Sequence, residues 1–467
     1  MVDLYLSDSL SKKKEKFVPI KENEVGIYSC GPTVYWNQHI GHMYAYVQWD
    51  ILVRFLRSQG YKVKWVMNIT DVGHMVSDED AGEDKMEKGA KREGLTVWQI
   101  ADKYIAQFKD SLKLLNVTTP DVLCRATEHI EDQINLIKKI EANGFTYKTS
   151  TGLVFDTSKF PDYAKFANLN LENQQAGARV KVDPEKKQLW DFLLWITNQP
   201  RHIMKWDSPW GMGFPGWHIE CTAMSVKYLG ERFDIHTGGK EHIPVHHTNE
   251  IAQAYGAFGH QTANYWLHNE WLIFDGQKMS KGLGNMVTAQ DLVAKGIDPL
   301  AMRYLILNSH YKQGLDFTWE SLKSAEKALS NIKYLISNIK TGSRNELSTE
   351  KLQKVDDYQE KFYHALADDL NVPQALATLW EMLKSNIPAE DKYDLAISFD
   401  EILGLNLNQV TNHKLQITNE VEELGKRREI LRKEGRYEEA DKIRLGIEKL
   451  GFLVLDTKEG VKYERKP

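Results

Sequence analysis

The feature that most constrains the fold is a strand–helix–strand pattern near the start of the chain. Residues 26–35, GIYSCGPTVY, are typical of a strand that runs into a loop, and residues 41–60 are typical of a helix that ends at Gly60. Residues 61–70, YKVKWVMNIT, complete the pattern as a second strand. Two strands joined in this way lie parallel in one sheet, whose carboxyl edge is where ligands bind. The pattern therefore predicts an α/β protein.

Changes in apolar periodicity divide the rest of the chain. Strand-like and helical patterns return at 233–276, so we expect a Rossmann-type parallel sheet that is split by an insertion. After residue 315, apolar side chains recur every three or four positions, which predicts an α-helical bundle. The last residues read as two helices flanking Gly435 and a hairpin. The expected domains are 1–314 with the insertion at about 72–215, a helical bundle at 315–412, and a small C-terminal domain at 413–467.

Composition excludes several classes of protein. The 467 residues carry a net charge of −5 and contain no apolar run near the ~18 residues that a membrane helix needs. The N-terminal residues lack the apolar stretch of a secretory signal, so we expect a soluble cytoplasmic protein without membrane contact. Three widely spaced cysteines, Cys30, Cys124 and Cys221, argue against a disulfide framework and leave metal binding or burial as their uses.

Two short motifs could handle phosphates. His39-Ile40-Gly41-His42 stands where the first strand's loop becomes a helix, and helix N-termini attract phosphate through free N–H groups. Lys278-Met279-Ser280-Lys281 follows a predicted hairpin and precedes a Gly-rich stretch, which suits a mobile clamp on transferring phosphates. Alone, each motif could equally be a solvated surface feature. Together and in this order, they are the signature of class I aminoacyl-tRNA synthetases.

A third set of residues has the chemistry of a zinc site. His246 and Glu250 are four residues apart and share one helical face. With Cys30 and Cys221 they form a set of soft and borderline donors that suits zinc. These positions are far apart in the sequence, so burial in the core is an alternative, and we keep that interpretation for Cys124.

Over nearly its whole length the chain resembles the cysteinyl-tRNA synthetase family. The motifs that carry the resemblance are YSCGPTVY, HIGH, NITD, WDSPWGMGFPGWHIECTAM, DIHTGG, HHTNEIAQ, KMSKGLGN, ALADDLNVPQALA and RYEEADKIRLGIEKLGFLVLDTKEG. The resemblance implies activation of L-cysteine by ATP, with Mg²⁺, and transfer of the cysteinyl group to tRNA(Cys). It also implies a monomer.

The resemblance assigns roles to individual residues. Cys30, Cys221, His246 and Glu250 would hold one Zn²⁺ per chain, which would also bind the substrate thiol. Lys281 would contact ATP, while His39, His42 and Lys278 would stabilise the adenylation transition state. Thr70, Trp217 and His236 would line the amino-acid pocket. A zinc selector is needed because serine is nearly isosteric with cysteine, and a pocket alone separates such analogues by only ~1–3 kcal/mol.

The C-terminal region is expected to read the anticodon. Residues 426–467 hold 13 Lys or Arg against 9 Asp or Glu, a local balance of +4 that suits contact with phosphates. A stabilising extension packed on the bundle is the alternative. The candidates for RNA contact are Arg427, Arg428, Arg432, Lys433, Arg436 and Tyr463.

Several residues depart from the family's pattern. Gly282 replaces the Ser that usually follows KMSK, Thr248 stands within HHTNE, and residues 240–247 read KEHIPVHH. The acidic segment Ser77–Asp84 is interpreted as a solvated loop.

Two other functions remain open. A ligase that joins activated cysteine to an amino sugar would share the catalytic half but lack the C-terminal end. A non-catalytic, zinc-stabilised RNA-binding paralogue would have no use for HIGH and KMSK.

Overall fold

The chain divides into two compact units, residues 1–407 and 408–467. The computed structural model describes residues 2–74, 84–168, 184–279, 284–339, 348–408, 419–450, 452–457 and 460–465. None of the helices within these ranges is both long enough and apolar enough to cross a membrane.

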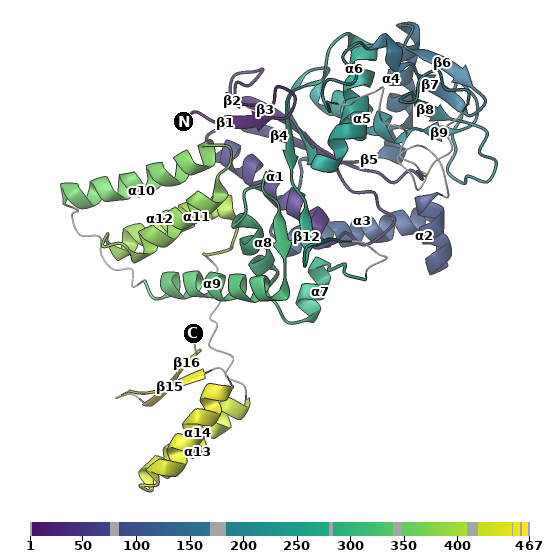
Figure 1. Ribbon diagram of the computed structural model, residues 1–467. Helices are drawn as coiled ribbons and strands as arrows, with labels where there is room; N and C mark the ends of the chain where they lie inside the picture. Colours follow the sequence, from purple (N-terminus) through teal and green to yellow (C-terminus); the bar gives the residue numbers. More distant parts are fainter. Residues whose placement is uncertain are drawn as a thin grey trace. The chain divides into compact units, whose positions relative to one another are not determined.

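A five-stranded parallel sheet forms the centre of the first unit, in the order β11-β10-β3-β4-β5 (Figure 1). Its strands are β3 (Glu24–Ser29), β4 (Lys62–Ile69), β5 (Val122–Arg125), β10 (Phe233–Gly239) and β11 (Ala263–Asn269). The α/β fold and the Rossmann-type parallel sheet are thereby confirmed. Strand β4, the next strand of this sheet along the chain, pairs with one edge of β3, and β10 pairs with the other edge of β3. A crevice is therefore expected at the carboxyl ends of β3 and β10.

The expected strand–helix–strand unit is present. Helix α1 (Ile40–Ser58) joins β3 to β4, and Gly60 ends the turn with a φ of 87°, a conformation that favours glycine. Residues 65–69 of β4 are all buried, as expected for a strand whose two faces are both covered. The first strand ends at Ser29 and runs into a loop as expected, because the chain leaves the sheet at Cys30 to form the cavity described below.

The insertion is narrower than the expected range of about 72–215. Helices α2 (Lys85–Glu93) and α3 (Val97–Leu114) lead into β5, which pairs with β4 and so belongs to the main sheet. A separate antiparallel sheet begins only at residue 146 and contains β6 (Thr146–Thr149), β7 (Gly152–Phe155), β8 (Phe192–Ile196) and β9 (Phe214–Pro215). Helix α4 (Ile130–Ala142) contacts this sheet.

Shorter elements complete the catalytic half. Helices α5 (Trp217–Leu229) and α6 (Thr248–Phe258) flank β10 along the chain, and β1 (Tyr5–Asp8) pairs with β2 (Lys13–Lys16). The remaining short elements are β12 (Leu272–Phe274), β13 (Gln277–Lys278), β14 (Leu315–Phe317), α7 (Ala289–Ala294) and α8 (Pro299–Leu307). Strands β12 and β13 form the expected hairpin at Asp275-Gly276, where both residues have positive φ.

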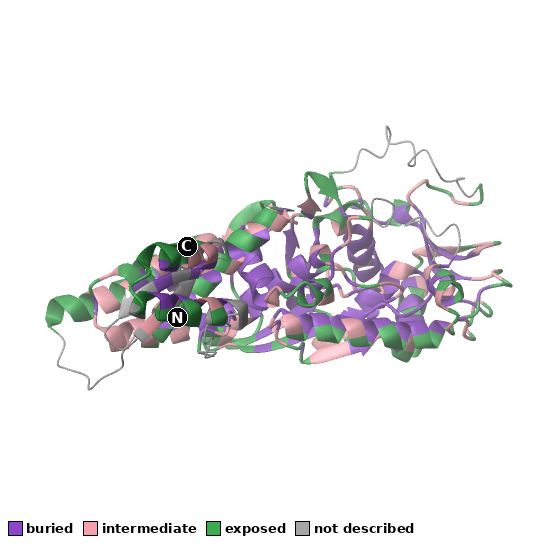
Figure 2. Cartoon of the chain, turned by 90° about the horizontal axis from the view of Figure 1, so that it is seen from below, coloured by how far each residue is buried: buried purple, intermediate pink, exposed green. Residues whose placement is uncertain are grey.

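The helical bundle shares a core with the sheet. Its helices are α9 (Trp319–Ser337), α10 (Thr349–Ala367), α11 (Val372–Lys384) and α12 (Ala389–Leu403). One apolar cluster runs from α1 and α8 into these helices, so residue 315 does not mark a break between compact units. Figure 2 shows buried residues concentrated where these elements pack together.

The second unit contains the helices and the hairpin that the sequence predicts. Helices α13 (Asn419–Lys433) and α14 (Tyr437–Lys449) flank Gly435 and are followed by the hairpin of β15 (Phe452–Thr457) and β16 (Gly460–Arg465). A small core supports it, made of Val421, Ile447, Phe452 and Val454. The expected linker around 411–419 lies almost entirely outside the described residues.

Candidate active site and metal centre

A cavity of about 440 Å³ opens where β3 and β10 end. Loops after these strands, the start of α1 and the β12–β13 hairpin form its walls. Eight of the predicted site residues line it: Cys30, His39, His42, Thr70, Trp217, Cys221, His246 and Lys278. The crevice expected from the sheet topology is thus the place where most of the predicted residues meet.

The two histidines of HIGH begin helix α1. Nδ1 of His39 accepts a hydrogen bond from Gly41 N at 3.1 Å, and Nδ1 of His42 accepts one from His39 N at 3.3 Å. The centroids of the two rings are 3.8 Å apart, and their planes are tilted by 30°. A neutral imidazole that accepts at Nδ1 carries its proton on Nε2, so both rings keep an N–H donor for a ligand.

Surrounding protein keeps these imidazoles neutral. Burial and the ammonium of Lys278 lower the pKa of His39 to about 4. His42 is exposed where it lines the cavity, and desolvation, together with the nearby His39 and His242, lowers its pKa well below 6.5. Neutral N–H donors can stabilise negative charge as it develops on a phosphate, although they do not keep an anion bound beforehand.

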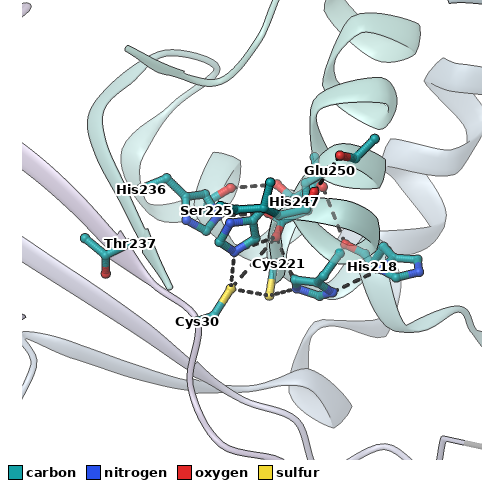
Figure 3. Close-up of polar contacts among 12 residues, drawn as sticks. Cys30, His218, Cys221, Ser225, His236, Thr237, His247 and Glu250 are labelled. Carbon is teal, nitrogen blue, oxygen red and sulfur yellow. Dashed lines mark hydrogen bonds and ion pairs between the residues drawn. The ribbon is translucent and has the colours of Figure 1, made fainter. Parts of the chain in front are cut away.

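The four candidate zinc ligands converge from three elements. Cys30 follows β3, Cys221 lies in α5 and Glu250 lies in the first turn of α6 (Figure 3). His246 lies in the turn just before α6. The cysteine Sγ atoms are 3.8 Å apart, Nε2 of His246 is 3.4 Å from Sγ of Cys221, and Oε1 of Glu250 is 3.1 Å from Nε2 of His246.

The charges of this cluster favour a bound cation. Burial raises the pKa of Cys30, whereas hydrogen bonds from Cys30 and His246 outweigh burial at Cys221 and lower its pKa to about 7. Burial also opposes the charge of Glu250, yet His236 and His246 lower the pKa of its carboxyl to about 2. A thiolate and a carboxylate side by side, with a second thiol and an imidazole, fit zinc.

His247 is a fifth possible donor that the sequence analysis missed. Its Nε2 lies 3.2 Å from Sγ of Cys30 and 3.8 Å from Oε1 of Glu250, and its Nδ1 is 2.7 Å from Nε2 of His268. The π-helical turn η4 (Ile243–His247) presents both histidines of the HH doublet, and the helical spacing to Glu250 had favoured His246 alone.

His236 lies behind the cluster and is not among the residues that line the cavity. Its Nε2 is 2.9 Å from Oε2 of Glu250 (Figure 3). Its ring stacks on that of Trp266 with centroids 4.3 Å apart. Such a contact orients a ligating carboxylate. His218 supports the other side, with its Nδ1 3.0 Å from Nδ1 of His246.

Thr70 and Trp217 lie in the wall of the cavity. Thr70 is fixed from behind by Glu220, a fully buried carboxylate that accepts its hydroxyl at 2.7 Å. The ring of Trp217 lies 4.4 Å from that of His246. Glu220 had no distinguishing signal in the sequence beyond its place beside Cys221.

The remaining predicted residues lie in several separate parts of the chain. Lys278 lines the cavity, with its Nζ 5.8 Å from the Trp271 ring, whereas Lys281 and Gly282 lie outside the described residues. Cys124 lies in β5 and is buried, with its Sγ 3.5 Å from the carbonyl oxygen of Met67, so burial explains it. Thr248 donates its hydroxyl to the carbonyl of Ile243 at 2.6 Å and thereby closes the π-helical turn.

Comparison with known proteins agrees with this geometry. The model of the class I (C) tRNA synthetase catalytic domain matches residues 16–327, and that of the DALR domain matches residues 361–388. A cysteine–tRNA ligase of Burkholderia lata is 45% identical over 98% of this chain and 96% of its own length. That of Treponema denticola is 42% identical, over 97% and 98%.

The chain belongs to the cysteine–tRNA ligase family. A solved structure, a methionyl-tRNA synthetase of Mycobacterium tuberculosis in complex with methionyl-adenylate, shares the fold with a TM-score of 0.58. It is 16% identical and covers 86% of this chain and 94% of its own. Both relatives match nearly the whole of this chain, including its C-terminal region, which disfavours the amino-sugar ligase considered above.

Proposed function

We propose that this enzyme activates L-cysteine with ATP to cysteinyl-adenylate and transfers the cysteinyl group to tRNA(Cys). One observation carries the proposal: the HIGH histidines and the Cys/His/Glu cluster line the same cavity. The phosphates and the amino acid can therefore be held side by side, as adenylation requires. We also propose that the enzyme is a monomer and that it acts in the cytoplasm.

The chain's own residues divide the work of adenylation. The cysteine carboxylate attacks the α-phosphorus of ATP, and pyrophosphate leaves. His39 and His42 donate Nε2–H bonds to the phosphate oxygens at the start of α1, where the helix dipole adds positive potential. Lys278 and Lys281 would follow the charge onto pyrophosphate, with Mg²⁺ on the phosphates.

The same chain would hold one zinc ion through Cys30, Cys221, His246 and Glu250. When bound, zinc would distinguish a thiolate from a hydroxyl, because a thiolate is a soft ligand and an alcohol at neutral pH is a poor one. His236 and His218 keep Glu250 and His246 in place. Thr70 and Trp217 shape the adjoining wall of the cavity.

Cysteine-dependent ATP–pyrophosphate exchange tests the reaction. The purified chain should exchange pyrophosphate with cysteine and not with the other amino acids at the same concentration. Lys281→Ala should lower kcat for exchange by about 10²-fold or more, with little change in the KM for cysteine, because its contact strengthens as pyrophosphate leaves. Exchange with another amino acid but not with cysteine contradicts the proposal.

The metal role needs its own test. Metal analysis of the folded chain should find zinc, and Cys221→Ser should weaken cysteine binding far more than ATP binding. A variant that loses this zinc and still selects cysteine over serine would refute the selector role. If Cys221→Ser does not fold, the metal is structural.

The second unit is assigned to the anticodon. Helix α13 carries Arg427 and Arg432. Arg436 is the N-cap residue of α14 and pairs with Glu434 and Glu439 on the surface. Arg428 is only 1% exposed, so that candidate is buried within its own unit. The side chains of Lys433 and Tyr463 lie outside the described residues. Specific RNA reading uses stacking and edge hydrogen bonds to unpaired loop bases, with cations on the phosphates.

Removal of residues 413–467 tests this assignment. The first unit ends at residue 407, so the truncated chain should fold and retain cysteine-dependent exchange. Charging of tRNA(Cys) should collapse. Charging that persists at near-normal kcat/KM would show that the second unit does not read the anticodon.

A further inference from the structure

A second group of metal-type donors lies apart from the Cys/His/Glu cluster. Asp84 caps the N-terminus of α2, Glu87 lies in the first turn of that helix, and His202 lies in the loop after β8. One donor atom of each lies within 4.8 Å of the others. Asp84 is only 7% exposed and His202 only 5%, so Asp84 is not part of the solvated loop that its acidic neighbours suggested.

The separations between these atoms are those of metal ligands. Nδ1 of His202 lies 3.4 Å from Oδ2 of Asp84 and 3.6 Å from Oε1 of Glu87. Hydrogen bonds between such groups are shorter, about 2.7–3.2 Å. Two ligands that each lie about 2.0–2.1 Å from a tetrahedral zinc ion are about 3.4 Å apart. The distances therefore suit an ion between the three groups better than direct hydrogen bonds.

The polar atoms of the group are held in place but not satisfied. Oδ1 of Asp84 accepts from Glu87 N at 2.7 Å, and Oε1 of Glu87 accepts from Ile203 N at 2.8 Å. The ring of His202 stacks on Phe214 with centroids 3.8 Å apart. Within the described part of the chain, Oδ2 of Asp84 is buried without a hydrogen-bond partner, although it faces His202. A buried carboxylate oxygen in that state is costly.

Electrostatics agree with this geometry. Burial raises the pKa of Asp84 to about 6, and burial together with His74 lowers the pKa of His202 to about 4. The imidazole is therefore neutral at physiological pH, which is the form that binds a metal. A cation between the groups would offset the cost of a charged Asp84.

We propose that Asp84, Glu87 and His202 bind a second divalent cation of the zinc class, with water completing its coordination. The ion would fix the start of α2 against the loop after β8. Lys85, the residue next to Asp84, lines the cavity, and its Nζ lies 5.8 Å from the ring of Trp217. The ion would thus anchor one wall of the cavity. This inference does not depend on the amino acid that the cavity accepts.

Zinc titration of the chelator-stripped, full-length chain tests the site. Wild type should bind two ions, and Cys221→Ser, Asp84→Asn and His202→Gln should each bind one. The Asn in Asp84→Asn keeps a side-chain oxygen that can cap α2, so the helix start is preserved. Asp298 caps α8 in the same way and serves as the matched control, since Asp298→Asn should still bind two ions.

Cobalt distinguishes the two sites without any variant. Only the Cys30/Cys221 site can give a sulfur-to-cobalt charge-transfer band, so ions at the new site should add d–d absorption without that band. Loss of the sulfur band alone would count against the Cys30/Cys221 site and would leave the proposal for the Asp84/Glu87/His202 site standing. The proposal is overturned if cobalt added to wild type never increases the d–d absorption without also increasing the sulfur band. It is also overturned if folded His202→Gln still binds two zinc ions.

Discussion

Glu220 shows how a residue without a motif can control a binding wall. One of its carboxylate oxygens accepts the hydroxyl of Thr70, and the other lies within hydrogen-bond distance, at 2.5 Å, of Nε2 of His74. Nδ2 of Asn68 donates to the same hydroxyl oxygen at 3.1 Å, while Oδ1 of Asn68 accepts from Gly31 N at 2.7 Å. The position of Thr70 therefore depends on a chain of buried contacts.

Glu220→Gln tests this role. The neutral amide weakens a charge-assisted hydrogen bond worth about 1.5–3 kcal/mol, so the KM for cysteine should rise about tenfold or more. The KM for ATP and the zinc content should not change. A variant with lower zinc content would implicate the neighbouring Cys221 instead, and an unchanged KM for cysteine contradicts the role of Glu220.

At this scale the sequence could identify donors but not their neighbours. Cys30, Cys221 and Glu250 were recognisable from donor chemistry and family resemblance, although spacing alone could not unite them. His247 was missed because a π-helical turn, which has no clear sequence signal, brings two adjacent histidines to one cluster. Asp84 was misjudged because its acidic neighbours hid its capping position.

Among the elements, one buried ion pair joins α1 to α8, and its arginine also reaches α12 of the helical bundle. Arg303 of α8 binds Asp50 of α1, and both side chains are completely buried. Its guanidinium also donates to the carbonyls of Leu403, Leu115 and Asn116. Burial opposes the charge of Asp50, yet Arg303 and Arg54 lower the pKa of its carboxyl.

Asp50→Asn should therefore destabilise the protein strongly. Removal of one partner leaves Arg303 charged and buried, which costs about 3–5 kcal/mol. Urea unfolding measures the loss. Glu231→Gln removes an exposed partner of Lys139 and should cost less than about 1 kcal/mol. Equal losses in the two variants would show that the buried pair does not hold the bundle.

Long periodic elements could be predicted, whereas short ones could not. The helix at 41–60 and the strand at 61–70 were placed within two residues, because their apolar patterns are long. Strand β5 has only four residues, one of which is Arg125, so its membership of the main sheet depends on pairing with β4. Because β5 was not recognised as a strand of the main sheet, the predicted insertion was too wide.

For the whole molecule, buried neutral histidines make stability depend on pH. Burial lowers the pKa of His218, His247 and His268 well below 6.5. Below pH 6.5 the unfolded chain takes up protons that the folded chain does not, so stability falls as pH falls from 6.5 toward the folded pKa values.

Each of these histidines should cost about 1.4 kcal/mol per pH unit in that range. The urea midpoint should therefore be lower at pH 5.5 than at pH 7.5. His268→Asn should reduce the difference, whereas His364→Asn, at an exposed position, should leave it unchanged. Identical midpoints at both pH values would contradict the account.

The most direct test of the whole account compares cysteine with serine. The cavity brings together the HIGH histidines and the Cys/His/Glu cluster. If these groups handle the phosphates and read the thiol as we propose, the chain should prefer cysteine at the activation step itself. Exchange measured with each amino acid should give a kcat/KM ratio of at least about 10⁴, far beyond what pocket size alone supplies. A ratio near 10² or below in the zinc-loaded chain would contradict the claim that the cluster reads the thiol.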